Sequence, residues 1–218
     1  MKVLGISGSP RPGGATERLV RSVLDGVEEC ETELISLAGR QIGGCIACMG
    51  CVADNTCRVL DDMWRLRALV VEADAYVIGA ANYYGTLNAL AHCFLERWYQ
   101  FCHGNCGAVA GKIAIAVSVG AVETEAPARA IQRLFRYHRV ECIGSISAKG
   151  AVASFSSGCG ENGTECAVHP ARRVATKRVE QTIPDLSKQP GICEEAHRLG
   201  RQLSMRLLER EETPGEEK

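Results

Sequence analysis

Residues 2–16 read KVLGISGSPRPGGAT, an apolar run followed by a loop of small residues. The run at residues 2–7 is typical of a strand that is buried on both faces of a parallel sheet. A helix is expected next, at residues 16–29, because its apolar residues recur at spacings of three and four and so share one face. These residues are Leu19, Val20, Val23, Leu24 and Val27. The chain therefore opens as a strand, a small-residue loop and a helix.

The alternation of strands and helices continues along the chain. Further strands are predicted at residues 33–37, 75–79, 112–118 and 141–147, and further helices at residues 63–71, 87–99, 126–137 and 194–208. Five strands that alternate with helices predict an α/β fold with a parallel sheet and right-handed crossovers.

One domain is expected at residues 1–210. It carries a cysteine-rich loop at residues 39–58 and an insertion at residues 154–191, in which a short helix is expected at residues 171–181. A loop as long as residues 39–58 in a compact domain is usually functional or disordered. The ending EREETPGEEK predicts a disordered acidic tail at residues 211–218.

The composition narrows the classes of partner. The 218 residues carry 25 basic and 26 acidic side chains, and the formal net charge of -1 offers no bulk attraction to nucleic acid or to an anionic membrane. The N-terminus MKVLGISGSP lacks the apolar stretch of a secretory signal. No segment approaches the roughly 18 consecutive apolar residues of a membrane span. A cytoplasmic protein without nucleic-acid or membrane partners is expected.

The loop after the first strand has the chemistry of an anion site. It brings backbone N–H groups and the N-terminus of a helix to one point, which attracts phosphate. Ser9 and Thr16 add hydroxyl donors, and Arg11 adds a charged fork that suits phosphate oxygens. The alternative is a tight turn in which Thr16 merely caps the helix. The position after the first strand, where open α/β sheets bind ligands, favours phosphate.

Four of the twelve cysteines cluster within one short loop. They follow the spacing C-x2-C-x2-C-x5-C and are Cys45, Cys48, Cys51 and Cys57. Gaps of two residues occur in ferredoxin-type [4Fe-4S] sites, whereas zinc sites usually pair two knuckles that lie farther apart. The spacing favours an iron-sulfur cluster and leaves open a zinc site or a loop of free thiols.

The remaining cysteines show no comparable spacing, and buried or incidental thiols account for most of them. A second metal site built from Cys159, Cys166, Cys193 or His169 is a less favoured interpretation. The five histidines have no motif spacing with a nucleophile, so hydrolase chemistry is also disfavoured.

Two further loops are expected at the edge that holds the anion site, because the carboxyl ends of parallel strands meet there. After the third strand come Asn82, Tyr83, Tyr84 and Thr86, whose aromatic faces and polar groups suit a flat ring with nitrogens and carbonyls. After the fourth strand comes Gly120, where backbone can approach a ligand closely. Alternatively, the tyrosines pack on a neighbouring helix or subunit.

Four motifs in order carry a resemblance to a known family: GISGSPRPGGAT, CIACMGCVADNTC, DDM and ADAYVIGAANYYGTLNALAHCFLER. Over roughly residues 1–148 the chain resembles the iron-sulfur flavoprotein branch of the NADPH-dependent FMN reductase family. The resemblance implies a flavodoxin-like, doubly wound, five-stranded parallel sheet of order 2-1-3-4-5, flanked by helices, that binds FMN. It also implies a [4Fe-4S] cluster on the four clustered cysteines.

The resemblance implies FMN contacts residue by residue. The phosphate loop contributes Ser9, Arg11, Ala15 and Thr16, and the ring loops contribute Ala81, Asn82, Tyr83, Tyr84, Gly85, Ser118, Val119 and Gly120. The chain departs from the family pattern at Ala15, where relatives often have Asn, and at Ala81, where they often have Pro. The segment AVETEAP follows Gly120 where a glycine-rich turn is common.

The implied function is an oxidoreductase that transfers electrons between a carrier such as ferredoxin, or NAD(P)H, and a small acceptor. The cofactors supply the chemistry, so no side chain is expected to act as a catalytic acid or base. Members of the family form homodimers or homotetramers in which a neighbouring subunit helps to enclose the flavin. The alternatives are an NAD(P)H-dependent FMN or quinone reductase without a cluster, and a non-enzymatic redox sensor or carrier.

Overall fold

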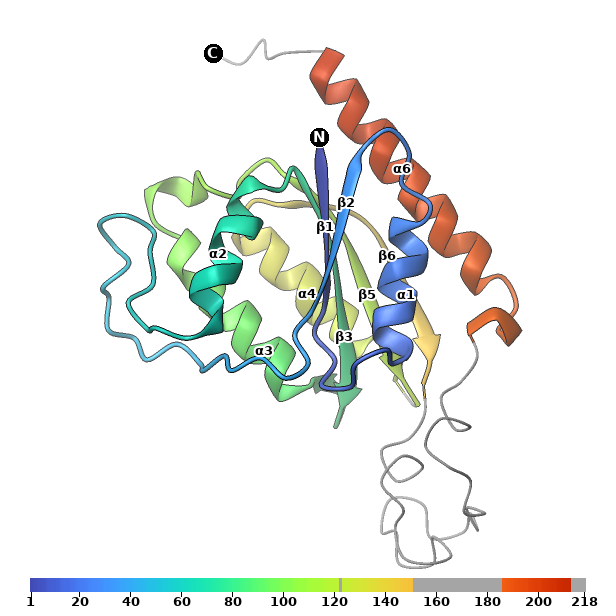
Figure 1. Cartoon of the computed structure of the whole chain (residues 1–218), viewed down its shortest axis with the longest axis horizontal. Helices are drawn as coiled ribbons and strands as arrows, with labels where there is room; N and C mark the ends of the chain where they lie inside the picture. Colours follow the sequence, from blue (N-terminus) through green and yellow to red (C-terminus); the bar gives the residue numbers. More distant parts are fainter. Residues whose placement is uncertain (122, 151–185, 213–218) are drawn as a thin grey trace, which may run out of the picture.

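A parallel sheet forms the centre of the computed structural model, which describes residues 1–121, 123–150 and 186–212 (Figure 1). The hydrogen-bonded order is β2-β1-β3-β5-β6, and a short β4 pairs antiparallel with β3. The predicted five-stranded order is thereby confirmed, since only the numbering changes when β4 is counted. The strands are β1 (Lys2–Ser7), β2 (Glu31–Ser36), β3 (Ala75–Tyr83), β4 (Thr86–Leu87), β5 (Ile113–Gly120) and β6 (Glu141–Lys149).

Helices cover both faces of the sheet (Figure 1). On one face α1 (Ala15–Leu24) and α6 (Ile192–Glu212) pack over one set of apolar strand residues. On the other face lie α2 (Asp62–Glu72), α3 (Ala89–Glu96) and α4 (Ala126–Tyr137), and they bury the opposite set. Short 3-10 helices follow at η1 (Arg97–Phe101), η2 (Gly104–Cys106) and η4 (Leu186–Lys188). Among the described residues no helix has the length and apolar character needed to cross a bilayer.

Several predicted boundaries are wrong, and the hydrogen bonds at each boundary show why. The first helix ends at Leu24, because the N–H groups of Gly26 and Val27 bond carbonyls three residues back and close a tight turn. The third strand continues to Tyr83, because it pairs with β5 as far as Ala81 and then turns back into β4.

The end of the chain also differs from the prediction. Helix α6 runs to Glu212, so residues 211 and 212 belong to the helix and not to the predicted acidic tail. The rest of that tail, residues 213–218, lies outside the described residues, as do residues 154–185 of the predicted insertion and its short helix.

Helices α1 and α6 cross at two glycines. A Cβ atom built on Gly200 would lie 2.2 Å from the carbonyl oxygen of Val23 and 2.7 Å from the carbonyl carbon of Gly26. Ser204, one turn farther along α6, accepts a hydrogen bond of 2.8 Å from the N–H of Glu28. The crossing therefore depends on backbone-to-backbone contact that only glycine permits at position 200.

Gly200→Ala is expected to lower the free energy of unfolding by about 1–3 kcal/mol, because the added methyl group overlaps backbone that cannot move aside cheaply. Urea unfolding followed by circular dichroism measures the change. Arg201→Ala is the control, since Arg201 is exposed on the same helix and its truncation should change stability by less than about 0.5 kcal/mol. Equal stability of the two variants would show that the crossing relaxes freely.

Candidate functional site

The loop between β1 and α1 lies against the end of β3. The N–H of Gly8 donates a hydrogen bond of 2.7 Å to the carbonyl of Gly79, and Ser9 is buried with its hydroxyl accepting from the N–H of Arg11 at 3.2 Å. The carboxylate of Glu17 accepts from the N–H of Gly13 at 3.2 Å. The loop is thus folded back on itself at the carboxyl edge of the sheet.

The N-terminus of α1 has no side-chain cap. Its N-cap residue is Gly14, which carries no side chain, and Thr16 lies inside the helix and is buried. The alternative in which Thr16 caps the helix is therefore wrong. Ser7, at the end of β1, has a buried hydroxyl oxygen with no hydrogen-bond partner among the described residues. An uncapped helix start beside an orphaned hydroxyl fits an anionic, hydrogen-bonding ligand such as the phosphate of FMN.

Asn88 joins the phosphate loop to the hairpin that follows β3. Its side chain is buried, donates to the carbonyl of Gly8 at 2.7 Å and accepts from the N–H of Ala81 at 3.2 Å. The N–H of Asn88 also donates to the carbonyl of Ala81 at 3.1 Å. One amide side chain therefore holds two candidate FMN loops at a set distance. Asn88 is not among the residues predicted from the sequence, because a single Asn between a strand and a helix gives no spacing signal.

The β3–β4 hairpin presents an aromatic side chain to solvent. Tyr84 and Gly85 have φ values of +54° and +77°, which is the pattern of a type I′ turn. Tyr84 is fully exposed, so it does not pack on a neighbouring helix of this chain. Asn82 and Tyr83 belong to β3 and not to a loop, and the side-chain amide of Asn82 donates to the carbonyl of Glu123 at 3.1 Å.

The third predicted segment is the end of β5. Ser118 is fully buried, and its hydroxyl bonds the carbonyl of Thr124 and, at 2.8 Å, the hydroxyl of Ser147. Val119 is also buried, and the carbonyl of Gly120 accepts from the N–H of Gly150 at 2.9 Å. The Ser118 side chain is therefore occupied within the protein, which leaves backbone as the part of this segment that can face a ring.

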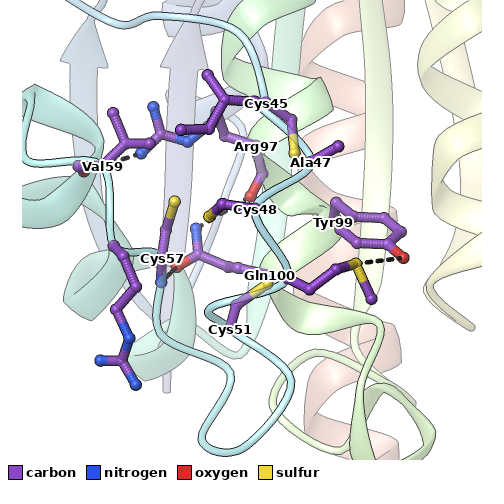
Figure 2. A pocket seen from close by; sticks show the side chains of 12 residues that line it. Cys45, Ala47, Cys48, Cys51, Cys57, Val59, Arg97, Tyr99 and Gln100 are labelled. Atoms are coloured by element: carbon purple, nitrogen blue, oxygen red, sulfur yellow. Dashed lines mark hydrogen bonds between the residues drawn. The ribbon is translucent and has the colours of Figure 1, made fainter.

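The four clustered cysteines all line one pocket (Figure 2). The loop that carries them contains neither helix nor strand between β2 and α2, as predicted. Cys48 is exposed, Cys45 and Cys57 are half-buried, and Cys51 is buried. The fold thus gathers the four thiols of the motif around a single hollow.

The cysteine loop is held by hydrogen bonds to the segment at residues 96–103, which we call the platform. It comprises the end of α3, the 3-10 helix η1 and His103. The carboxylate of Glu96 accepts from the N–H of Cys45 at 2.9 Å, and the Gln100 side chain accepts from the N–H of Cys57 at 3.2 Å. The ring nitrogen Nε2 of His103 lies 3.3 Å from the sulfur of Cys51. The loop is therefore held near three of its four cysteines by one stretch of the chain.

Arg97 closes the two ends of the cysteine loop. Its guanidinium donates to the carbonyls of Gly43 and Val59, each at 3.1 Å, and pairs with Asp61 at 2.6 Å. Burial lowers the pKa of the Arg97 guanidinium, but the hydrogen bond to Asp61 and the charge of Cys57 outweigh burial and raise the pKa overall. The pKa of Asp61 is lowered because its bond to Arg97 and two backbone N–H groups outweigh the opposing effect of burial.

The charges of the four thiols affect one another's ionisation. Burial raises the pKa of the Cys51 thiol, and the charges of Cys57, Cys45 and Cys48 raise it further against one backbone hydrogen bond. Four negative thiolates in this hollow would repel one another. A cationic inorganic core bound among them would remove that penalty.

The positions of the donor groups can be compared with two kinds of metal centre. Among the described residues no three His, Cys, Asp or Glu side chains converge as a single ion requires. A zinc ion needs ligands at about 2.0–2.3 Å from one point. A [4Fe-4S] cluster instead takes four thiolates on different irons, so they surround a hollow. Four thiols around one pocket fit the second arrangement.

Sequence analysis also missed the platform residues Glu96, Arg97, Gln100 and His103. Their spacing carried a signal, because Glu96, Gln100 and His103 follow one another at intervals of four and three and so share a face. Between these polar residues lie apolar residues that are buried, such as Trp98 and Phe101. Polar residues on one side of an otherwise apolar helix mark a surface that another segment covers.

The other cysteines form no second centre among the described residues. Cys102 lies 3.4 Å from Nε2 of the buried His138, and burial raises the pKa of its thiol, as does the nearby Cys106. Cys193 begins α6 on the opposite face of the sheet. Cys159, Cys166 and His169, which the sequence offered as further ligands, lie outside the described residues.

Known proteins resemble the chain in sequence and in fold. The NADPH-dependent FMN reductase family matches residues 1–153. An iron-sulfur flavoprotein of Methanocaldococcus jannaschii is 31% identical over 169 residues, which cover 76% of this chain and 86% of that protein. An iron-sulfur flavoprotein of Methanosarcina thermophila is 27% identical over 157 residues, which cover 70% of this chain and 82% of that protein.

Solved structures show the same fold at lower sequence identity. The apo form of an NADH:FMN oxidoreductase superposes with a TM-score of 0.59 at 13% identity, over 94% of this chain and 89% of that chain. An archaeal flavodoxin superposes with a TM-score of 0.55 at 13% identity, over 95% of this chain and 99% of that chain. The sheet order, the helices on both faces and the match over residues 1–153 agree, and the chain belongs to the NADPH-dependent FMN reductase family of FMN-dependent oxidoreductases.

Proposed function

We propose that the protein is an iron-sulfur flavoprotein that transfers electrons between a carrier, such as ferredoxin or NAD(P)H, and a small acceptor. The observation that carries this proposal is the arrangement of Cys45, Cys48, Cys51 and Cys57 around one pocket. They are the ligands that we assign to a [4Fe-4S] cluster. The names of the relatives from Methanocaldococcus jannaschii and Methanosarcina thermophila support this assignment.

FMN is assigned to the carboxyl edge of the sheet. The phosphate is held by the loop before α1, where Ser9, Arg11 and Thr16 add to the backbone N–H groups of the helix start. This assignment is supported by the absence of a side-chain cap on α1 and by the orphaned hydroxyl of Ser7. Ala15 is the first residue of the helix, so its backbone N–H has no intrahelical acceptor and is available to the same phosphate.

The flavin ring is assigned to the space beside the β3–β4 hairpin. Ala81, Asn82, Tyr83, Tyr84 and Gly85 would flank it on one side, and the backbone of residues 118–120 on another. FMN supplies the redox chemistry when it is bound, while these residues position it and exclude water from its faces. The exposed Tyr84 suits a homodimer or homotetramer in which a second subunit covers the ring.

The helix α3 links the two assigned cofactor sites. It begins beside Asn88 at the FMN edge and ends at Glu96, which holds Cys45. Its eight residues span about 12 Å at 1.5 Å per residue. The chain thereby positions both sites on one rigid element, which keeps their separation constant during turnover.

Anaerobic purification followed by analysis of flavin, iron and acid-labile sulfide per chain tests the proposal. We expect about one FMN together with about four irons and four sulfides, the content of one [4Fe-4S] cluster. FMN without iron, even after anaerobic reconstitution with iron and sulfide, would refute the cluster. The function would then be that of an NAD(P)H-dependent FMN or quinone reductase, and oxidation of NAD(P)H by the iron-free protein would demonstrate it.

A further inference from the structure

Arg97 is a buried cation beside the cysteine pocket. Its side chain is 1% exposed, and it lines the hollow together with the four cysteines. A charged group so far from water is costly unless the protein pairs it and satisfies its hydrogen bonds. The other arginine at the pocket, Arg58, is half exposed and pairs with Asp54, so water already screens its charge.

The hydrogen bonds of Arg97 leave its Nε donor unused. A guanidinium has five N–H donors, and the bonds to Gly43, Val59 and Asp61 engage only its two terminal nitrogens. The Nε atom is buried and has no partner among the described residues. A buried and unused charged donor is expensive, which indicates that it serves a ligand of the pocket.

Cys57 is the pocket group that acts on Arg97. Both residues line the pocket, and the charge of the Cys57 thiol raises the pKa of the guanidinium. In Figure 2 the Cys57 sulfur points toward Arg97 from the opposite wall of the pocket. Asp61 already balances the charge of Arg97 one for one, so thiolates in the pocket would add negative charge beside this buried guanidinium.

We propose that Arg97 is a positioning residue of the cluster site, which donates a hydrogen bond to a Cys57 thiolate and sets the reduction potential of the cluster. This inference rests on the proposed function, because it requires a cluster on the four cysteines. Reduction adds a negative charge to the cluster, and a buried positive charge nearby stabilises the reduced form more than the oxidised form. Net charge and hydrogen bonds to the sulfurs are among the factors that set such potentials.

The test compares the midpoint potential of the cluster, monitored by EPR, in the wild type and in Arg97→Gln, Arg97→Lys and Arg198→Gln. Iron, sulfide and FMN content and the unfolding midpoint are measured on the same samples. Arg97→Gln is expected to shift the potential to more negative values. Arg97→Lys keeps the positive charge but loses the planar set of guanidinium donors, so it should shift the potential less. Arg198→Gln removes an exposed charge from α6 and should leave the potential unchanged.

The outcomes separate the possible failures. A cluster with the wild-type potential in variants of Arg97 that retain their iron would overturn the proposal. The proposal would also be overturned if both variants lost iron and FMN and unfolded at a lower midpoint, since that pattern indicates that Arg97 only stabilises the fold. Absence of iron from the wild type itself, even after anaerobic reconstitution, would refute the proposed function, and the role of Arg97 at the cluster would fall with it.

Discussion

Replacing Cys48 by alanine is expected to remove the iron and sulfide from the protein and to leave its FMN in place. Cys48 is the exposed member of the four pocket cysteines, so its truncation opens no cavity in the core. The substitution leaves three of the four thiolates that would hold a [4Fe-4S] cluster, so one iron loses its protein ligand and becomes open to solvent. The iron content should fall from about four per chain toward zero.

Cys193→Ala is the matched control for this experiment. Cys193 is a half-buried thiol on α6, across the sheet from the pocket, so the same chemical change should leave iron, sulfide and FMN unaltered. Full iron content in Cys48→Ala would show that Cys48 is not a ligand. Loss of FMN together with iron would mean that the substitution disturbs more than the pocket, because the FMN loops share no hydrogen bond with Cys48 among the described residues.

Asn88→Ala is expected to weaken FMN binding by about 10- to 100-fold. The truncation leaves the buried carbonyl of Gly8 and the N–H of Ala81 without their side-chain partner. An unsatisfied buried polar group costs about 1–3 kcal/mol, and about 1.4 kcal/mol corresponds to a tenfold change in affinity. Both groups belong to loops that we assign to FMN. Part of this free-energy cost should therefore appear as a higher dissociation constant for FMN. Titration of the FMN-free protein, followed by quenching of flavin fluorescence, measures the dissociation constant.

Asn88→Asp separates the two hydrogen bonds of this side chain. The carboxylate keeps an acceptor for the N–H of Ala81 but loses the donor to Gly8 and places negative charge near the phosphate loop. It should therefore bind FMN no better than Asn88→Ala. Gln202→Ala, which removes an exposed amide from α6, is the control and should bind FMN as the wild type does. Unchanged affinity in Asn88→Ala would show that the two loops hold their positions without this link.

Part of the fold and of the candidate site could be predicted from short stretches of the chain. The apolar run before Ser7 and the small-residue loop after it predicted a buried parallel strand and an anion site at its end. The spacing of Cys45, Cys48, Cys51 and Cys57 predicted a shared site, and the structure places all four around one pocket. The strand and the gathering of the four cysteines are confirmed, because each depends on neighbours in the sequence, through periodicity or the reach of a loop. The anion site stays a prediction.

Boundaries were less predictable, because tertiary contacts set them. The spacing of Val27 continues the apolar face of α1, yet the helix ends at Leu24 where α6 crosses. Asn82 and Tyr83 were expected in a loop, yet pairing with β4 keeps them in β3. At α1 a helix from elsewhere in the chain outweighs the local pattern, and at β3 the hairpin with β4 does so.

The sequence by itself determined the alternation of strands and helices, the sheet order through the family resemblance, and which four cysteines share one loop. Only the tertiary structure decided which groups surround them. Cys45 meets Glu96 across 51 positions, Cys51 meets His103 across 52, and Asn88 meets Gly8 across 80. Contacts between such distant residues follow from how the helices pack on the sheet, and that packing depends on the summed burial of many side chains and on no local pattern.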